Sequence, residues 1–132
     1  MNDKLLLSIL TPEKLLYSGE ITAVVSQNNE GSFEILRNHT ALVTVIVPTI
    51  TVFTEKDGKK LKAFTSDGVL KVDNNKVEIL CEAAEWPEDI DLKRAEGAKE
   101  RAEKRLSSKD TIDTKRAQFA LKRSLMRIKA KK

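Results

Sequence analysis

Arginine residues recur at helical spacing in the last third of the chain. Arg94 and Arg101 are seven residues apart, which is two helical turns, and Arg123 and Arg127 are four apart. If two helices that carry them fold against each other, the four guanidinium groups come together, and clustered cations favour an anion between them. Spacing alone leaves two other interpretations open: each arginine is solvated, or each pairs with a neighbouring glutamate.

The residues around these arginines follow a helical period. From Asp91 onward, small and apolar residues recur at three- and four-residue steps, and a second such face follows a break at residues 107–110. The first face comprises Leu92, Ala95, Ala98, Ala102 and Leu106, and the second comprises Ala117, Ala120, Leu121, Ser124, Leu125 and Ile128. Pro87 and Asp89 or Asp91 are start signals for the first helix, and Asp110 or Asp113 can cap the second. We expect residues 129–132 to be frayed.

Alanine dominates the first helical face, so this helix buries little apolar area. Burial contributes about 25 cal/mol per Å², whereas ordering each residue costs about 1–2 kcal/mol of backbone entropy. Gly97 in the middle of the helix costs about 1 kcal/mol more than alanine. We therefore predict a marginal helical hairpin, which a small ligand or a partner can shift between arrangements.

The sequence before residue 88 has the features of β-structure. Short runs of β-branched and apolar residues follow one another at intervals of about 8–12 residues. Turn signals separate them, among them residues 17–20, residues 27–31, Asp57-Gly58 and residues 73–76. We predict an antiparallel β-sandwich over residues 1–87 and an α-helical hairpin over residues 88–132.

Charge divides the chain at the same place. Residues 1–87 carry 9 Lys/Arg and 12 Asp/Glu, a net charge of −3, and residues 88–132 carry 15 Lys/Arg and 8 Asp/Glu, a net charge of +7. A basic tail on a mildly acidic body suggests an anionic partner: nucleic acid, a nucleotide, a membrane surface or an acidic protein face. The other interpretation is a solvated helical surface.

Residues for catalysis or metal binding are sparse. His39 is the single histidine and lies next to a turn, and Cys81 is the single cysteine, so neither a catalytic triad nor a cysteine-based metal site is expected. The chain contains no phosphate-binding loop and no His-Glu-x-x-His motif. We expect no signal peptide, and the sequence contains no apolar run of the roughly 20 residues that span a bilayer. We expect it to lie in the cytosol, or on the surface of a membrane.

Short motifs in both halves resemble those of a known family, the epsilon subunits of bacterial F-type ATP synthases. In the first half they are Thr11-Pro12-Glu13, Tyr17-Ser18-Gly19-Glu20, Ile35-Leu36-x-x-His39, Leu42-Val43, Ser66-x-Gly68-x-Leu70-x-Val72 and Asn75-Lys76-Val77. In the second half they are Ala84-Glu85, Glu88-Asp89-Ile90-Asp91, Arg94-Ala95, Ala98-Lys99-Glu100-Arg101-Ala102 and Ala120-Leu121-Lys122-Arg123. Their order and spacing cover nearly the whole chain.

The resemblance implies a non-catalytic subunit of the rotary central stalk, which serves ATP synthesis and ion transport. It implies a sandwich of about ten strands that contacts the gamma subunit and the c-ring, at the cytoplasmic face of the bacterial cell membrane and peripheral to it. It also implies two mobile helices that extend toward the beta subunits and inhibit ATP hydrolysis. The basic helices would then meet an acidic segment of beta rather than nucleic acid.

In some members of this family the folded hairpin binds ATP through an Ile/Leu-Asp-x-x-Arg-Ala motif, here Ile90, Asp91, Arg94 and Ala95. Glu85, Arg101, Arg123 and Arg127 also fall at positions that resemble the nucleotide site. The resemblance thus implies ATP as a regulatory ligand, with no required cofactor and no metal.

The chain departs from the family at two glycine-rich turns. A usual Gly-Glu-Leu-Gly-Ile-Leu-Pro-Gly-His run is here residues 31–39, which lack two glycines and a proline, and a usual Ser-Gly-Gly is here Ser66-Asp67-Gly68. One alternative function stays open, a nucleic-acid-binding module with a basic helical hairpin. Against it, acids alternate with bases in the tail, and Phe119 is the tail's single aromatic residue.

Overall fold

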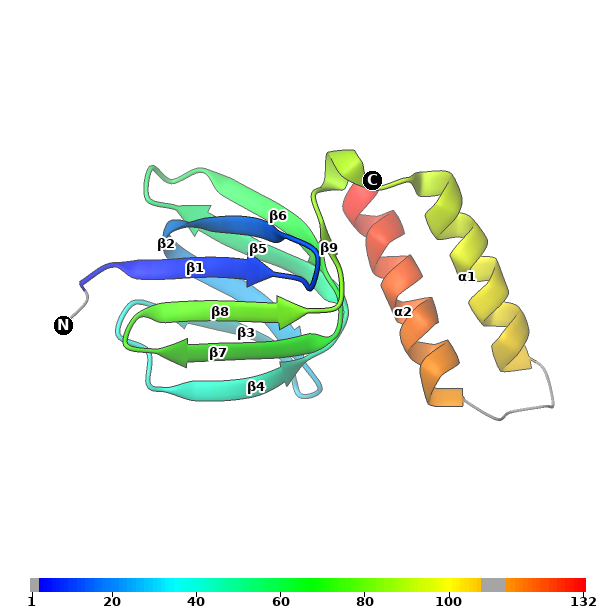
Figure 1. Ribbon diagram of the computed structural model, residues 1–132, viewed down its shortest axis with the longest axis horizontal. Helices are drawn as coiled ribbons and strands as arrows, with labels where there is room; N and C mark the ends of the chain where they lie inside the picture. Colours follow the sequence, from blue (N-terminus) through cyan, green and yellow to red (C-terminus); the bar gives the residue numbers. More distant parts are fainter. Residues whose placement is uncertain (1–2, 108–113) are drawn as a thin grey trace.

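The computed structural model describes residues 3–107 and 114–132. It consists of a β-rich body with two antiparallel helices at one end (Figure 1). The amino terminus lies at the far end of the body from the helices, and the carboxyl terminus lies beside the segment that joins the body to the first helix. Within the described residues, none of the helices is long and apolar enough to cross a membrane.

Nine strands form the body in the part of the chain that the structure describes. They are β1 (Leu5–Leu10), β2 (Leu15–Asn28), β3 (Gly31–Leu36), β4 (Leu42–Ile46), β5 (Thr49–Glu55), β6 (Lys60–Thr65), β7 (Gly68–Asp73), β8 (Lys76–Cys81) and β9 (Ala84–Glu85). In β1 and β7 buried residues alternate with less buried ones, which is the two-residue period of a strand with one face toward a core.

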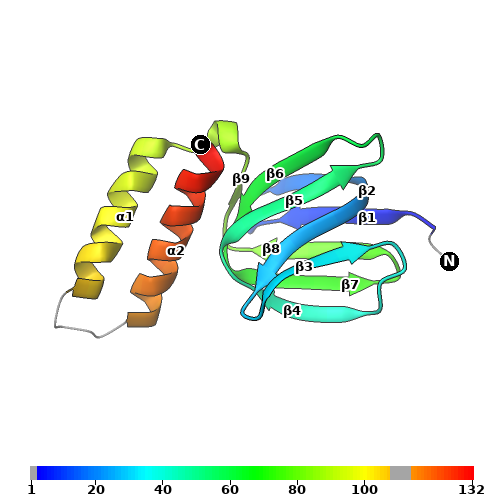
Figure 2. The ribbon, with the colours of Figure 1, turned by 180° about the vertical axis from the view of Figure 1, so that it is seen from behind.

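The strands form one sheet that folds back on itself. Its order is β1-β8-β7-β4-β2-β5-β6-β9, with β3 paired to β2 outside that order. β1, β8, β7 and β4 make one layer, and β2, β3, β5 and β6 make the other (Figures 1 and 2). β1 pairs with β8 in parallel and with β2 in antiparallel fashion, which joins the layers at one edge. The predicted sandwich is confirmed.

The second strand corrects the sequence prediction. β2 is one strand of 14 residues that continues through residues 17–20, where a turn was predicted. Tyr17 and Gly19 pair with Ile9 and Leu7 in the ladder with β1. The Tyr17 ring packs on the Phe53 ring at 4.5 Å between centroids, and this tertiary contact outweighs the local turn preference of Ser and Gly. The turn prediction is wrong, whereas the nine strands of the described residues agree with the expected sandwich of about ten.

The main core lies between the two layers of the sandwich. It is mainly aliphatic, as the low aromatic content predicts, and the most buried side chains include Leu7, Ile9, Ile46, Leu70 and Ile79. Such side chains contribute about 1.5–3 kcal/mol each when they are fully buried. We therefore expect the sandwich to be the more stable part of the molecule and to give the helices a rigid surface to pack on.

The predicted helical hairpin is confirmed. Its helices are α1 (Leu92–Ser107) and α2 (Thr114–Lys131). Small residues lie between them, because Ala95 and Ala102 of α1 and Ala117 and Ser124 of α2 are buried. The Ser124 hydroxyl donates a hydrogen bond to the Ala120 carbonyl oxygen at 2.8 Å, so its polar group is satisfied. The predicted break and the predicted caps of the second helix fall partly or wholly at residues 108–113, outside the described residues.

The second helix lies between the first helix and the sandwich (Figures 1 and 2). A small second core joins it to the body, in which Phe64, Ile90 and Ala130 are buried and Met126 packs against them. α2 continues to Lys131 because Ala130 fills this apolar contact. The prediction that residues 129–132 fray is therefore wrong for the helical residues up to Lys131.

The junction between sandwich and helices is anchored at Trp86. Its ring lies 6.3 Å from the Tyr17 ring and 6.2 Å from the Phe53 ring, measured between centroids. A short 3₁₀ helix, η1 (Pro87–Asp89), follows at once, and the Asp89 amide donates to the Trp86 carbonyl oxygen. The aromatic contact fixes the chain as far as Trp86, so any movement of the hairpin pivots after this residue.

Candidate anion-binding site

A cleft lies where α1, β9, α2 and the turn between β1 and β2 come together. Its volume is about 530 Å³, within the range of small-molecule sites. Its lining residues are Thr11, Glu13, Lys14, Ala83, Ala84, Glu85, Asp89, Asp91, Arg94, Ala95, Ala98, Arg101 and Arg127. Six of the eight residues that the resemblance implied line this cleft, and the other two, Ile90 and Arg123, do not.

Arg94 and Arg101 reach the cleft from the first helix, as their spacing predicts. Both are exposed, and neither makes an ion pair or a side-chain hydrogen bond with another described residue. A terminal nitrogen of Arg101 lies beside Gly97, 3.5 Å from where a β-carbon would be. That distance is an ordinary van der Waals contact, so the guanidinium group of Arg101 lies along the helix over Gly97.

Arg127 reaches the same cleft from the second helix, but it already has a partner. Its Nε donates to Oε1 of Glu85 at 2.6 Å. Its guanidinium carbon also lies 4.5 Å from the centre of the buried Phe64 ring, a distance typical of a cation–π contact. Glu85 and Phe64 are cross-strand partners in β9 and β6, so they present one face to Arg127.

Arg123 lies outside the cleft. One of its terminal nitrogens donates to Oδ1 of Asp67 at 3.0 Å, in the turn between β6 and β7. The two side chains are 29% and 32% exposed, so the ion pair is only partly screened by water. The structure thus brings three of the four arginines that were selected by their spacing into one cleft, namely Arg94, Arg101 and Arg127. The fourth, Arg123, forms an ion pair with the sandwich instead.

The Ile90-Asp91-x-x-Arg94-Ala95 motif also has a role in folding. The Asp91 carboxylate accepts a hydrogen bond from the Arg94 amide at 3.0 Å, so Asp91 is the N-cap of α1. Ile90 is buried against the second helix, and Ala95 is buried between the helices. Arg94 is the motif residue whose side chain has no such partner among the described residues. The motif therefore fixes the start of α1 and leaves one cation facing the cleft.

Donors and acceptors are both present in the cleft. Four cations line it, Lys14, Arg94, Arg101 and Arg127, and so do four carboxylates, Glu13, Glu85, Asp89 and Asp91. Guanidinium and ammonium groups suit phosphate oxygens, whereas carboxylates accept hydrogen bonds from hydroxyl and amino groups. Ala83, Ala84, Ala95 and Ala98 add a small apolar surface. This mixture suits a ligand that carries phosphates, hydroxyl groups and a flat ring.

The turn between β1 and β2 is the part of the cleft that sequence reasoning missed. The Thr11 hydroxyl accepts hydrogen bonds from the amides of Glu13 and Lys14, at 3.3 and 3.2 Å, which fixes the turn. A Thr-Pro pair predicts a turn there. Nothing local predicts that this turn faces a helix some 80 positions later, because that contact depends on the tertiary fold.

Known families match both parts of the chain. Residues 4–87 match the ATP synthase delta/epsilon chain β-sandwich domain, and residues 88–132 match the ATP synthase delta/epsilon chain long α-helix domain. The chain therefore belongs to the delta/epsilon family of ATP synthase chains, and the predicted resemblance is confirmed.

Within that family, the similar curated proteins are ATP synthase epsilon chains. The epsilon chain of Clostridium kluyveri is 52% identical over 128 residues, which cover 97% of each chain. That of Clostridium novyi is 52% identical over 122 residues, covering 92% of this chain and 93% of the relative. That of Clostridium botulinum strain Langeland is 52% identical over 131 residues, covering 99% and 98%.

Two solved structures share the fold. A chain of the Euglena gracilis mitochondrial ATP synthase, from a structure of its OSCP/F1/c-ring, matches with a TM-score of 0.81 and 23% identity over 95% of this chain and 79% of that one. A chain of the Tetrahymena thermophila mitochondrial ATP synthase, from a structure of its central stalk and c-ring, matches with a TM-score of 0.63 and 18% identity over 98% and 97%. At these identities the match concerns the fold alone.

Proposed function

We propose that this chain is a non-catalytic regulatory subunit in the central stalk of an ATP synthase, and that its folded helical hairpin binds ATP. The observation that carries the ATP site is one cleft lined by three cations, Lys14, Arg94 and Arg101, that form no ion pair with another residue that the structure describes. The cleft also holds four carboxylates, but among the described residues none of them forms an ion pair with these three cations, so a polyphosphate can supply their partners.

The residues of the cleft suggest a division of roles toward ATP. Arg94, Arg101 and Arg127 bind the phosphates, as guanidinium forks do elsewhere. Glu85 and Asp91 supply carboxylate oxygens for hydroxyl or amino groups, in addition to the contacts that they already make. Ile90 and Ala95 act indirectly in this proposal, because their burial fixes the first turn of α1 against the sandwich.

Ligand binding and hairpin folding are linked by this arrangement. The walls of the cleft come from the sandwich and from both helices, so the complete site exists only when the hairpin is folded. ATP then stabilises the folded form by RT ln(1 + [ATP]/Kd), about 2.7 kcal/mol at a hundredfold excess over Kd. When ATP is scarce, the marginal hairpin opens.

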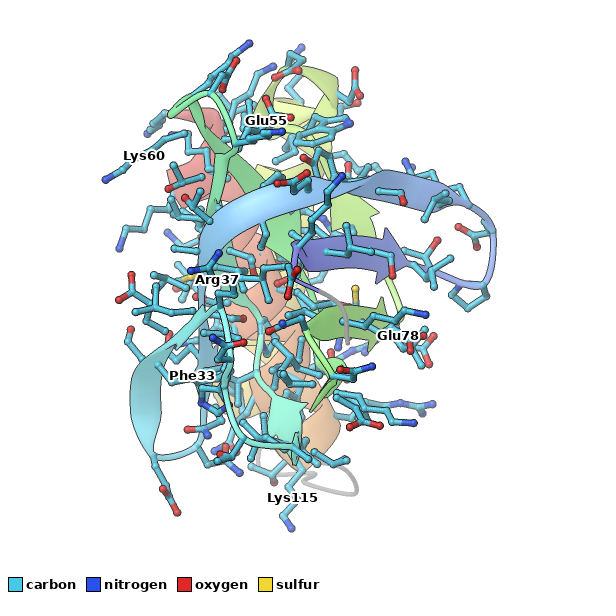
Figure 3. The ribbon with its side chains drawn as sticks, turned by 90° about the vertical axis from the view of Figure 1, so that its left-hand side faces the viewer. Phe33, Arg37, Glu55, Lys60, Glu78 and Lys115 are labelled. Atoms are coloured by element: carbon cyan, nitrogen blue, oxygen red, sulfur yellow. The ribbon has the colours of Figure 1, made fainter. Side chains whose placement is uncertain are left out.

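The opened helices account for regulation in this proposal. Many of their basic side chains are exposed even in the folded form, and Lys115, near the start of α2, points away from the body (Figure 3). Such a basic surface suits an acidic segment of a catalytic beta subunit. Contact with that segment would restrain ATP hydrolysis, while the sandwich stays on the rotor.

A row of exposed apolar residues on the sandwich suits a rotor contact. Val45, Val69 and Leu80 are neighbours across β4, β7 and β8, and the pairing continues through Leu10 of β1 to Leu15 of β2. Val45 and Leu80 are 62% and 48% exposed. Contiguous exposed apolar residues mark interaction sites, so we assign this row to contact with the gamma subunit or the c-ring. The chain would then lie at the cytoplasmic face of the cell membrane as part of the complex.

The ATP site is tested by calorimetric titration of the full chain. We expect the wild-type chain to release or absorb heat with ATP, and Arg101→Gln to weaken binding by about tenfold or more, because hydrogen bonds to charged groups contribute about 1.5–3 kcal/mol. Arg105→Gln is the matched control, since Arg105 is on the same helix and outside the cleft lining. No heat with the wild-type chain at millimolar ATP would remove the proposed site.

The nucleic-acid alternative gains no support from the cleft or the sandwich. Two of the arginines that would bind a nucleic acid backbone, Arg123 and Arg127, are turned toward the sandwich and paired with Asp67 and Glu85. A steep salt dependence of DNA affinity would favour the alternative.

A further inference from the structure

The two arginines of α2 have different surroundings although they are one turn apart. Arg127 lines the cleft, whereas Arg123 is bound to Asp67 at 3.0 Å and does not line it. Because Arg123 is outside the lining of the cleft, a phosphate group in the cleft would reach it only if its side chain left Asp67 and turned toward the ligand. The contact with Asp67 joins α2 to the turn between β6 and β7 outside the cleft, so it acts on the position of α2 separately from the contacts that the cleft provides.

The sandwich supplies a different cation to the cleft. Lys14 lies in the turn between β1 and β2 and lines the cleft together with Arg94 and Arg101. Its side chain makes no ion pair or hydrogen bond with another described residue. The Thr11 hydroxyl fixes the backbone of this turn through two hydrogen bonds, so the backbone position of Lys14 is well defined. Because the side chain of lysine is flexible, its ammonium group can reach a phosphate group over a range of positions in the cleft.

We propose that Lys14 belongs to the ligand-binding set of the cleft and that Arg123 does not, because Arg123 and Asp67 form a latch that holds α2 on the sandwich whether or not the cleft is occupied. The assignment of Lys14 rests on the proposed ATP site. The latch rests on the ion pair alone.

This division of roles has a consequence for regulation. Arg127 with Glu85 and Arg123 with Asp67 both join α2 to the sandwich, and the first of these pairs lies in the wall of the cleft and is open to a ligand. The other, Arg123 with Asp67, is outside it. The ligand and the latch therefore stabilise the folded hairpin through separate contacts. Lys14 adds a direct contact between the sandwich and the ligand.

The role of Lys14 is tested by titrating ATP into the full chain and its variants. We expect Lys14→Gln to weaken ATP binding about two- to fivefold, the range for one exposed charge contact. Lys14→Arg retains most of the affinity, and Lys71→Gln, at an exposed position on β7 outside the cleft, retains all of it. Equal affinity of Lys14→Gln and the wild-type chain, when the wild-type chain binds ATP, overturns the assignment.

The latch is tested by hydrogen exchange of the α2 amides without ATP. We expect Asp67→Asn and Arg123→Gln to speed exchange to a similar extent, and the double variant to add nothing more, because both single changes remove the same contact. With ATP, both single variants should weaken binding equally. Tighter ATP binding by Asp67→Asn, or a much larger loss in Arg123→Gln than in Asp67→Asn, would show that Arg123 contacts the ligand and would overturn the latch.

The two parts of the experiment separate this inference from the proposed function. A wild-type chain that binds no ATP removes the proposed site and the role of Lys14 with it. The exchange comparison needs no ATP, so it still decides whether Asp67 and Arg123 hold the helix. Unchanged exchange in both single variants would contradict the latch even if the chain binds ATP.

Discussion

Arg127 and Glu85 are joined by a hydrogen bond of 2.6 Å that connects the last helix to the last strand of the sandwich. The same guanidinium group covers the ring of Phe64, the cross-strand partner of Glu85. One arginine thus docks the helix, covers the small second core and forms part of the wall of the cleft. A ligand in the proposed site would therefore contact a residue that also docks the second helix on the sandwich.

The capping role of Asp91 can be tested by substitution, without any ligand. Asp91→Ala should lower the stability of the hairpin by about 1 kcal/mol, because the carboxylate accepts the Arg94 amide at the start of α1. Asp91→Ser should retain most of this stability, since serine is also a good N-cap. The measurement is the thermal loss of the helical circular dichroism signal. If serine is as destabilising as alanine, the capping role is wrong.

Gly68 and Gly97 should respond in opposite ways to alanine. A β-carbon at Gly68 would overlap the Leu80 carbonyl oxygen and lie 2.7 Å from Cα of Cys81, so β7 and β8 would have to move apart. We expect Gly68→Ala to lower the free energy of unfolding by about 1–3 kcal/mol. Gly97→Ala should raise helix stability by up to about 1 kcal/mol. Urea unfolding measures both, and a neutral Gly68→Ala would contradict the close strand contact.

Tyr17 should ionise at unusually high pH. Burial raises the pKa of its phenol to about 12, and the hydrogen bond that the phenol donates to Glu55 adds to the shift. This contribution to stability is complete below the unfolded-state pKa of about 10 and is lost as pH rises through the folded-state value. Tyr17 is the chain's single tyrosine, so tyrosinate absorbance reports it directly.

The control for Tyr17 is Tyr17→Phe, which keeps the ring. Its free energy of unfolding should fall less steeply than that of the wild-type chain as pH rises from about 10 to about 12. Tyrosinate that forms near pH 10 in the folded chain would show that the phenol is solvated and unbonded.

The general architecture could be predicted because the spacing of apolar residues changes only once, near residue 90, from a pattern typical of strands to the three- and four-residue steps of a helix. The prediction failed at residues 17–20, where Ser18 and Gly19 favour a turn locally but the Tyr17 ring contacts Phe53 and holds the strand extended. Local propensity is weaker than a core contact. The same reason explains why α2 continues to Lys131 although fraying was predicted at the end of the chain, because Ala130 is buried in the small second core.

The candidate site was predicted only in part. Helical spacing placed Arg94 and Arg101 on one side of the first helix, and the predicted folding of the two helices against each other brought Arg127 to the same cleft. Lys14 and Asp67 carry no such signal, since their nearness to the helices depends on how the sandwich turns meet the hairpin. Arg123 has the right spacing, but a turn residue of the sandwich holds it outside the cleft.

The exposed apolar row on the sandwich can be tested without affecting the core. Val45→Lys should leave the stability of the isolated chain nearly unchanged, because Val45 is 62% exposed. It should weaken binding to the cognate ATP synthase complex lacking this subunit, measured by co-sedimentation. Glu34→Gln, which changes charge by the same amount at an exposed position outside the row, is the control. Full binding by Val45→Lys would contradict the proposed contact.

The central claim is that the helical hairpin regulates hydrolysis while the sandwich joins the complex. The most direct test is the ATP hydrolysis rate of a cognate complex lacking this subunit, after addition of the full chain or of a chain ending at Pro87, with binding of each measured in parallel. We expect the full chain to inhibit, with less inhibition at high ATP, and the shortened chain to bind without inhibiting. If both bind and neither inhibits at any ATP concentration, the helices do not regulate hydrolysis and the account is contradicted.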